Sequence, residues 1–355
     1  MTIHKIKDLI NNFPSGMTSP PSRFELLGVG SPIMDLLARV PEEFLQTIAG
    51  AKGGMVLVEP AEMAQLVARL AAPPAIAPGG SAANTTAAVA RLGLPATFLG
   101  KLGNDDTATL YRARSLAAGI DGSRFKTGAL PNARCLSLIT PDSQRTLRTC
   151  LAAAMTLRPD EISGADFQGC RHAHMEGYLL FNPALATAVV DAARAAGCTL
   201  SVDLASFEVV NAARPWLLDQ LQRGLQAVFA NEDEIRALFP GSTDYAALAR
   251  QLATHGTIAA VKLGKDGAWV ARGGELHRIQ PVAVPQVVDT TGAGDAWAAG
   301  FLFGYLQGWA LPAAGALGSL LGAETVRHLG PAIPESEWPR LRAAALALAA
   351  GPYGR

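Results

Sequence analysis

The sequence of 355 residues lacks an excess of charge of either sign. Thirty lysines and arginines balance thirty aspartates and glutamates, and charged residues make up only 17% of the chain. No basic stripe is present, so the composition argues against nucleic acid as a partner. Hydrophobic residues make up 49% of the chain, which is enough to bury a large core in one big domain or two.

Cysteines are few, and none are arranged in a C-x-x-C pair. The four cysteines are widely spaced along the chain, at Cys135, Cys150, Cys170 and Cys198. Such spacing is typical of reduced, mostly buried thiols, and it indicates a cytoplasmic protein. His172 and His174 alternate onto one face of an expected strand, but no third ligand follows at a suitable spacing. We therefore do not expect a zinc site.

Two common nucleotide-binding motifs are also missing. No G-x-x-x-x-G-K-[ST] occurs, which excludes a P-loop kinase by motif. Gly28-Val29-Gly30 begins a dinucleotide fingerprint, but position 33 is Ile33 where the third glycine belongs. This weak match argues against a Rossmann-type dehydrogenase.

No segment reads as a signal peptide or a membrane span. Residues 1–22 carry Lys5, Lys7 and Asp8 without a long apolar core, and we interpret them as an N-terminal extension. The uncharged stretch 296–323 is long enough to span a bilayer, but six glycines and the break at 307–312 interrupt it. Two buried helices joined by a short turn fit this stretch better than a membrane helix.

The most informative segment is Val287–Trp297, in which Gly292-Ala293-Gly294 leads from Asp289 to Asp295. The pattern predicts a tight glycine turn that opens a buried helix. Backbone N–H groups and the helix dipole at such a turn favour an anion, above all a phosphate. A carboxylate beside a phosphate, here that of Asp295, is suited to take a proton from an attacking hydroxyl. The plainer alternative is a closely packed helix start with an aspartate that serves the dipole.

A second motif lies about 210 residues earlier, where Gly79 and Gly80 precede an alanine-rich helix. We expect Ser81 to cap this helix, Asn84 to face the loop one turn in, and Gly93 to end the helix after Leu92. The glycines allow the backbone to approach a ligand closely.

Short apolar runs alternate with helical stretches through most of the chain. Expected strands lie at 24–30, 98–99, 171–178, 199–204 and 227–230. A strand, a glycine turn and a second strand are expected over 259–269, and a hairpin over 135–149. Asn182 and Pro183 are typical of a helix start. The strand–helix–strand rhythm predicts a parallel α/β fold. Asp35 then follows the first strand, where open α/β sheets bind ligands, although a loop aspartate that caps a turn has the same sequence context.

The two glycine motifs together resemble the signatures of the PfkB, or ribokinase-like, small-molecule kinases, and the resemblance covers roughly residues 24–335. It implies an α/β fold of the ribokinase-like type, a three-layer α/β/α architecture with a mostly parallel central sheet and a small β-sheet lid. We place the kinase domain at 23–345, the lid segments at about 36–60 and 128–152, and a tail at 346–355.

The resemblance also implies roles for individual residues. Gly292, Ala293 and Gly294 match the anion hole for the transferred phosphoryl group, and Asp295 matches the general base. The residues that match or lie near acceptor contacts are Asp35, Gly79, Gly80, Asn84 and Glu176. Arg148 has two open interpretations, since it either points into the site or is an ordinary exposed strand arginine.

Further positions match the nucleotide and metal sites of the family. Asn231 and Glu234 match the pattern that organises Mg²⁺ through its waters, although acidic residues in a first helical turn are also ordinary capping. The nucleotide-binding loop is matched by Lys262, Gly264 and Gly267, and His328 falls among the adenine contacts. Lys262 replaces a threonine of many members and either reaches a phosphate or projects outward. Asp289 and the Thr291 carbonyl match a site for a monovalent cation such as potassium.

The resemblance therefore implies an ATP-dependent kinase that phosphorylates a hydroxymethyl group of a nucleoside or sugar. Segments 145–151, 176–178 and 229–234 resemble the adenosine-kinase-like branch, which places adenosine ahead of ribose, fructose or 2-keto-3-deoxygluconate. Only 6% of residues are aromatic, so few side chains are available to stack a base, with Phe207 as one candidate. A non-catalytic regulatory relative is the rival from another class, and both a monomer and a homodimer remain open.

Overall fold

The computed structural model describes residues 23–142 and 144–351. The expected N-terminal extension lies outside the described residues. The C-terminal helix α13 (Trp338–Ala350) continues past residue 345, where we had placed the start of the tail.

A nine-stranded sheet forms the centre of the molecule, in the order β16-β15-β14-β13-β12-β11-β1-β5-β7. Neighbours from β7 to β14 pair in parallel, and only β15 and β16 add antiparallel pairs at one edge. The mostly parallel sheet expected from the strand–helix rhythm is therefore confirmed. Its strands are β1 (Phe24–Val29), β5 (Ala96–Leu99), β7 (Ile120–Asp121), β11 (Cys170–Glu176), β12 (Thr199–Asp203), β13 (Ala227–Ala230), β14 (Ile258–Lys262), β15 (Ala268–Arg272) and β16 (Glu275–Ile279).

Helices cover both faces of this sheet. Successive strand residues point to opposite sides, so apolar strands contribute side chains to a core on each face. Along β13, Val228 belongs to one hydrophobic core and Phe229 to the other. One face packs against α6 (Gly164–Phe167), α7 (Pro183–Ala195), α8 (Phe207–Gln222), α9 (Glu232–Leu238) and α10 (Tyr245–Leu252). The other packs against α4 (Ser81–Leu92), α11 (Ala293–Leu306), α12 (Leu311–Thr325) and α13. The three-layer α/β/α architecture is confirmed.

The uncharged stretch 296–323 forms two helices, as predicted. Helix α11 ends at Leu306 and α12 begins at Leu311. The glycines in this stretch allow the two backbones to meet, since a Cβ on Gly300 would lie 2.6 Å from the carbonyl oxygen of Leu317. Among the described helices, none has the length and apolar character needed to span a bilayer.

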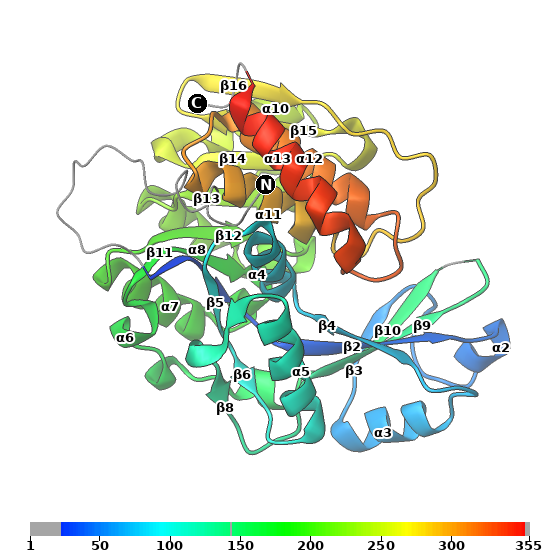
Figure 1. Cartoon of the computed structure of the whole chain (residues 1–355). Coiled ribbons are helices and arrows are strands. Elements are labelled where there is room, and N and C mark those ends of the chain that lie inside the picture. Colours follow the sequence, from blue (N-terminus) through cyan, green and yellow to red (C-terminus); the bar gives the residue numbers. More distant parts are fainter. Residues whose placement is uncertain (1–22, 143, 352–355) are drawn as a thin grey trace.

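A second, five-stranded sheet projects from one side of the large sheet (Figure 1). Its order is β3-β10-β9-β2-β4, built from β2 (Ile33–Arg39), β3 (Met55–Leu57), β4 (Ala75–Gly79), β9 (Arg134–Ile139) and β10 (Arg145–Cys150). The expected hairpin is the antiparallel pair β9–β10. Strand β4 comes from outside the two lid segments that we expected. The remaining elements are α2 (Glu42–Leu45), α3 (Pro60–Ala68), α5 (Asp106–Ala117) and the short pair β6 (Lys101–Leu102) and β8 (Lys126–Thr127).

The two histidines of β11 lie in the core. His172 and His174 both lie 2.8 Å from Oγ of Ser201, which places their side chains on one face of the sheet. Burial lowers the pKa of His172 to about 3 and that of His174 to about 4, so both rings are neutral near pH 7. Of the four free cysteines, three are buried and Cys135 is partly buried.

Candidate active site

Polar side chains gather where the parallel strands of the large sheet end. Glu176 ends β11, Asp203 ends β12 and Lys262 ends β14. The carboxyl edge of an open α/β sheet is where such folds bind ligands. The first turn of α11, which carries the glycine signature, faces the same edge, because Lys262 Nζ lies 3.2 Å from the position of a Cβ on Gly294.

The signature forms the expected turn at the start of α11. Gly292 is the N-cap residue and adopts a left-handed φ of 74°. A side chain would be strained there and would also meet Pro331, whose Cβ would lie 2.5 Å from the added carbon. Ala293 and Gly294 follow as the first helical residues, so their amides lie at the positive end of the helix dipole. The turn thus has the geometry of a helix start whose first amides are free of intrahelical partners, which favours an anion.

Asp295 is held by the other glycine motif. Its Oδ1 accepts a hydrogen bond of 2.7 Å from Oγ of Ser81, and its Oδ2 accepts one of 2.9 Å from Nδ2 of Asn84. Burial raises the pKa of Asp295 to about 6, although these two hydrogen bonds act to lower it. The carboxyl group is therefore oriented and mostly ionised at neutral pH, as a general base requires.

This arrangement corrects the role that we expected for Ser81. Gly80 is the N-cap of α4, and Ser81 is the first helical residue without a capping hydrogen bond. The end of the helix is as predicted, because Gly93 terminates α4 with a left-handed φ of 114°. The Ser81 hydroxyl is thus available for Asp295.

Gly79 and Gly80 leave room for neighbouring protein atoms just before α4. A Cβ on Gly79 would lie 2.3 Å from Oδ2 of Asp35, and one on Gly80 would lie 2.2 Å from the carbonyl oxygen of Ser31. Asp35 lies within β2 and faces this corner. Burial raises its pKa to about 7, the charge of Arg145 opposes that rise, and the charge of Asp295 adds to it. The structure thus brings Asp35 together with both motifs.

Glu176 contacts the loop after β1 and the start of α4. It is almost fully buried, and its carboxylate accepts hydrogen bonds from the backbone N–H of Ser31 at 2.8 Å and of Ala82 at 3.3 Å. Burial raises the pKa of Glu176 to about 7. Its contacts fix the loop after β1 and the first turn of α4.

Lys262 points into the site rather than outward. Its ammonium group lies 2.7 Å from Oδ2 of Asp203 and is largely buried next to Gly294. Burial acts to lower the pKa of Lys262, but the charges of Asp203 and Glu234 outweigh it and raise the pKa. A fixed positive charge therefore lies beside the first turn of α11.

Asn231 and Glu234 form a capping box at the start of α9. The Asn231 side chain accepts from the Glu234 amide at 2.9 Å, and Glu234 accepts from the Asn231 amide at 2.8 Å. The capping interpretation is therefore confirmed. Burial and then the charge of Asp203 raise the pKa of Glu234 to about 7. No described set of three or more histidine, cysteine or acidic side chains forms a direct metal site.

The two arginines of β10 have different surroundings. Arg148 is buried within the small sheet, where it donates to the carbonyl oxygens of Leu147 and Ala49. The structure therefore does not bring Arg148 into the site, nor does it leave it exposed. Arg145 instead reaches the signature, donating to Oγ1 of Thr291 at 2.6 Å and forming an ion pair with Asp289.

The carboxylate of Asp289 has three polar partners. Besides the ion pair with Arg145, its carboxylate accepts from the backbone N–H of Thr291 at 3.0 Å and of Gly330 at 2.6 Å. These bonds fix the loop in front of Gly292. A guanidinium thus pairs with the carboxylate to which the family resemblance assigns a monovalent cation, although it contacts the hydroxyl of Thr291 and not the carbonyl.

The remaining positions that we matched to the nucleotide site lie on different elements. Gly264 and Gly267 form the turn between β14 and β15, both with positive φ. The ring of His328 lies just beyond α12, with Nε2 2.8 Å from Oε1 of Glu324. Sequence reasoning missed three contributors, namely Arg145, Ser81 and Asp203. Only contacts between distant segments reveal them.

The chain matches the model of the pfkB family of carbohydrate kinases over residues 61–338. Among solved structures, the adenosine kinase of Sinorhizobium meliloti is 33% identical, with a TM-score of 0.81 over 91% of this chain and 100% of that one. A probable sugar kinase from Rhizobium etli is 32% identical, with a TM-score of 0.81 over 92% and 99% of the two chains.

A curated relative agrees with this assignment. The adenosine kinase of Schizophyllum commune is 26% identical over 90% of this chain and 99% of its own length. The signature at the start of α11, the ribokinase-like fold and these similarities agree with one another. The chain belongs to the PfkB family of kinases, within its adenosine-kinase-like branch.

Proposed function

We propose that the protein transfers the γ-phosphoryl group of ATP to a hydroxymethyl group of a nucleoside, with adenosine as the first candidate. The observation that carries this proposal is the pair of hydrogen bonds from Ser81 and Asn84 to Asp295 at the mouth of a helix-start anion site. Asp295 takes the proton of the acceptor hydroxyl. The amides of Gly292, Ala293, Gly294 and Asp295 stabilise the charge that develops on the transferred group.

The acceptor is held by Asp35, Gly79, Gly80 and Asn84, with Glu176 fixing the backbone beneath them. Asp35 and Asn84 offer carboxylate and amide groups for sugar hydroxyls. A side chain on either glycine would meet Asp35 or the backbone of Ser31, so the glycines allow these groups to pack closely. Asn84 contacts Asp295 directly. The charge of Asp295 acts to raise the pKa of both Asp35 and Glu176, and Gly79 lies against Asp35. Positioning of this kind supplies most of the rate enhancement in phosphoryl transfer.

The nucleotide and its Mg²⁺ lie on the other side of Asp295 in this proposal. Lys262 provides a charge for the phosphates, and Gly264, Gly267 and His328 contact the remainder of the nucleotide. The carboxylate of Glu234 already accepts two hydrogen bonds from Asn231, so it suits a contact to Mg²⁺ through water rather than a direct bond. Mg²⁺ neutralises phosphate charge when it is bound.

Asp289 and Thr291 buttress the anion-binding turn through a cation. Arg145 supplies that positive charge through the Asp289 carboxylate and the Thr291 hydroxyl. Potassium bound to Asp289 and the Thr291 carbonyl would share only the carboxylate with it. The proposal therefore does not require potassium.

The test is a coupled assay of ADP release with Mg-ATP, run with wild type and Asp295→Asn. Its panel holds adenosine, guanosine, inosine, cytidine, ribose, fructose and 2-keto-3-deoxygluconate. Turnover of a nucleoside that the variant loses supports the proposal. Turnover of a free sugar alone retains the kinase chemistry and rejects the nucleoside, and silence across the panel favours a non-catalytic relative.

A further inference from the structure

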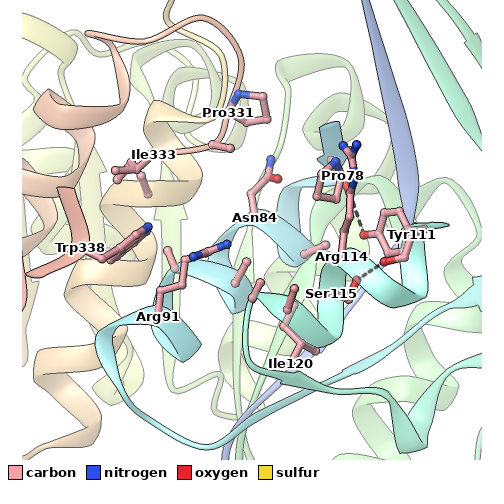
Figure 2. A pocket seen from close by; sticks show the side chains of 18 residues that line it. Pro78, Asn84, Arg91, Tyr111, Arg114, Ser115, Ile120, Pro331, Ile333 and Trp338 are labelled. Atoms are coloured by element: carbon pink, nitrogen blue, oxygen red, sulfur yellow. Dashed lines mark hydrogen bonds between the residues drawn. The ribbon is translucent and has the colours of Figure 1, made fainter. Parts of the chain in front are cut away.

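A cavity of about 220 Å³ lies behind the acceptor residues, between α4, α5 and the segment 331–338 (Figure 2). Asn84 and Gly79 line its inner end, and Arg91 and Trp338 line its outer part. Asp35, Asp295 and the β9–β10 hairpin do not line it, so only its inner end, at Gly79 and Asn84, borders the proposed acceptor residues. Nothing in the proposed reaction uses this space.

The walls are mostly apolar, and their charged groups have one sign. Small and aliphatic side chains of α4 and α5 form much of the surface, together with the rings of Tyr111 and Trp338. Arg91 and Arg114 are the two charged residues that line the cavity, and no carboxylate lines it within the described structure. An apolar cavity that contains guanidinium groups favours a ligand with an apolar body and a negative charge.

Trp338 gives a second and independent indication of a ligand. Its side chain is only 2% exposed, yet its indole Nε1 has no hydrogen-bond partner among the described residues. Figure 2 shows this nitrogen turned toward the cavity, with the guanidinium of Arg91 nearby. A buried donor without an acceptor costs free energy, which an acceptor group on a ligand would recover.

The charge around Arg91 is incompletely balanced. Burial lowers the pKa of Arg91, and the second cation Arg342 lowers it further. Its ion-pair partner Glu335 is 72% exposed, so water and salt screen that pair. An anion in the cavity would meet a guanidinium that is only partly neutralised.

We propose that this cavity is a second binding site, which takes a small aromatic carboxylate. The fork of Arg91 matches the geometry of a carboxylate, and the Trp338 N–H supplies a further donor. The volume of about 220 Å³ limits the ligand to a small molecule with a single ring. The ring packs against the apolar faces of α4 and α5.

The position of the site couples it to the signature. Pro331 lines the cavity and also packs against Gly292, and the neighbouring Gly330 donates to Asp289. Asn84 lines the cavity and donates to Asp295. If the proposed kinase activity holds, occupation of the cavity therefore changes KM for the acceptor more than it changes the affinity for the nucleotide.

The test measures binding directly and does not depend on activity. Benzoate, its neutral analogue benzamide and its cationic analogue benzamidine are titrated into the full chain by ligand-observed NMR. We expect benzoate to bind with a dissociation constant of about 1 mM, because a fragment of this size makes few contacts. Benzamide binds at least about tenfold more weakly, since it lacks the charge, and benzamidine does not bind. Equal binding of the three analogues, or no binding of benzoate, overturns the proposal.

Three variants locate the site. Arg91→Gln removes the charge, Trp338→Phe keeps a ring but removes the N–H, and Ala87→Phe fills the cavity from α4. Each weakens benzoate binding by about tenfold or more, whereas the control Arg194→Gln on α7 leaves it unchanged. Thermal unfolding confirms that each variant is folded. Benzoate binding that persists in both Arg91→Gln and Ala87→Phe shows that the ligand binds elsewhere, and the proposal fails.

Discussion

Asn84 donates a hydrogen bond from Nδ2 to Oδ2 of Asp295 over 2.9 Å, although 211 positions separate the two residues in the chain. The bond joins the glycine motif at the start of α4 to the signature at the start of α11. Ser81 supports the other carboxylate oxygen from the same helix turn. The orientation of the expected base thus depends on the packing of two helix N-termini against each other.

Asp295→Asn tests the base directly. The amide retains the shape of the side chain but takes up no proton, so we expect the turnover number to fall by about 10² to 10⁴-fold. The melting temperature should stay close to that of wild type. Steady-state kinetics under saturating acceptor and ATP measure the change. A turnover number within about threefold of wild type would remove Asp295 from the role of base.

Asn84→Ala tests the hydrogen bond through the pH profile. The ionised form of Asp295 does the chemistry, so wild-type activity should fall as the pH drops below about 6, the pKa of Asp295. The Asn84 hydrogen bond favours the carboxylate and lowers that pKa, so its loss moves the acidic limb to higher pH by about one unit.

The matched control is Thr85→Val. Thr85 donates to the backbone carbonyl of Asp295 rather than to the carboxylate, at 3.1 Å. Its removal should leave the acidic limb in place. The idea fails if both variants, or neither, shift the limb of kcat/KM against pH.

Local patterns predicted much of this molecule, and long-range contacts account for what they missed. The turn at Gly292, the stop at Gly93 and the two helices within 296–323 all follow from signals within a few residues. The predicted capping role of Ser81 was wrong. A serine at the start of a helix has the same local sequence whether it caps the helix or contacts a distant carboxylate.

The two arginines of β10 show the same limit. They lie three positions apart, so in a strand their side chains point to opposite faces. The pairing of β10 with β9 and β3 decides which of its two faces turns toward the signature. The packing of this sheet near Asp289 then brings Arg145 into contact with it. The sequence alone offered no reason to prefer Arg145 over Arg148.

Lys262→Met tests whether the buried ammonium serves the phosphates. We expect the variant to raise KM for ATP and to lower kcat, with a combined loss of about 10- to 100-fold in kcat/KM, because one charge beside the anion site is removed. It also leaves Asp203 buried without its partner, which destabilises the fold by about 3 kcal/mol.

The double variant Lys262→Met, Asp203→Asn separates these two effects. It removes the orphaned charge and should regain much of the lost stability, as measured by urea unfolding. Activity should stay low if the lysine contacts the phosphates. Recovery of wild-type kcat/KM in the double variant would mean that Lys262 serves only the structure.

Arg145→Gln tests the cation at Asp289. Wild type should be equally active in potassium and in tetramethylammonium salts, because the guanidinium already neutralises the carboxylate. The variant should be weak in tetramethylammonium and at least about tenfold more active in potassium, since the vacated oxygens then suit a small cation. Arg145→Lys should behave like wild type, and so should the exposed control Arg158→Gln. A wild-type enzyme that needs potassium contradicts this account.

Glu176→Gln tests the buried carboxyl through the dependence of stability on pH. Burial raises the pKa of Glu176 from 4.5 to about 7, so the folded state binds its proton more tightly than the unfolded state does. Its contribution to stability is therefore fully present below about pH 4.5 and is lost as the pH rises toward 7.

Relative to Glu176→Gln, wild type should thus lose up to about 3 kcal/mol of unfolding free energy between pH 4.5 and 7.5, since each pKa unit corresponds to about 1.4 kcal/mol. Denaturant unfolding followed by circular dichroism at several pH values measures this difference. Glu208→Gln, an exposed change on α8, should show no such trend. A difference between wild type and Glu176→Gln that does not vary with pH would mean that Glu176 is ionised throughout, held by the backbone N–H groups of Ser31 and Ala82.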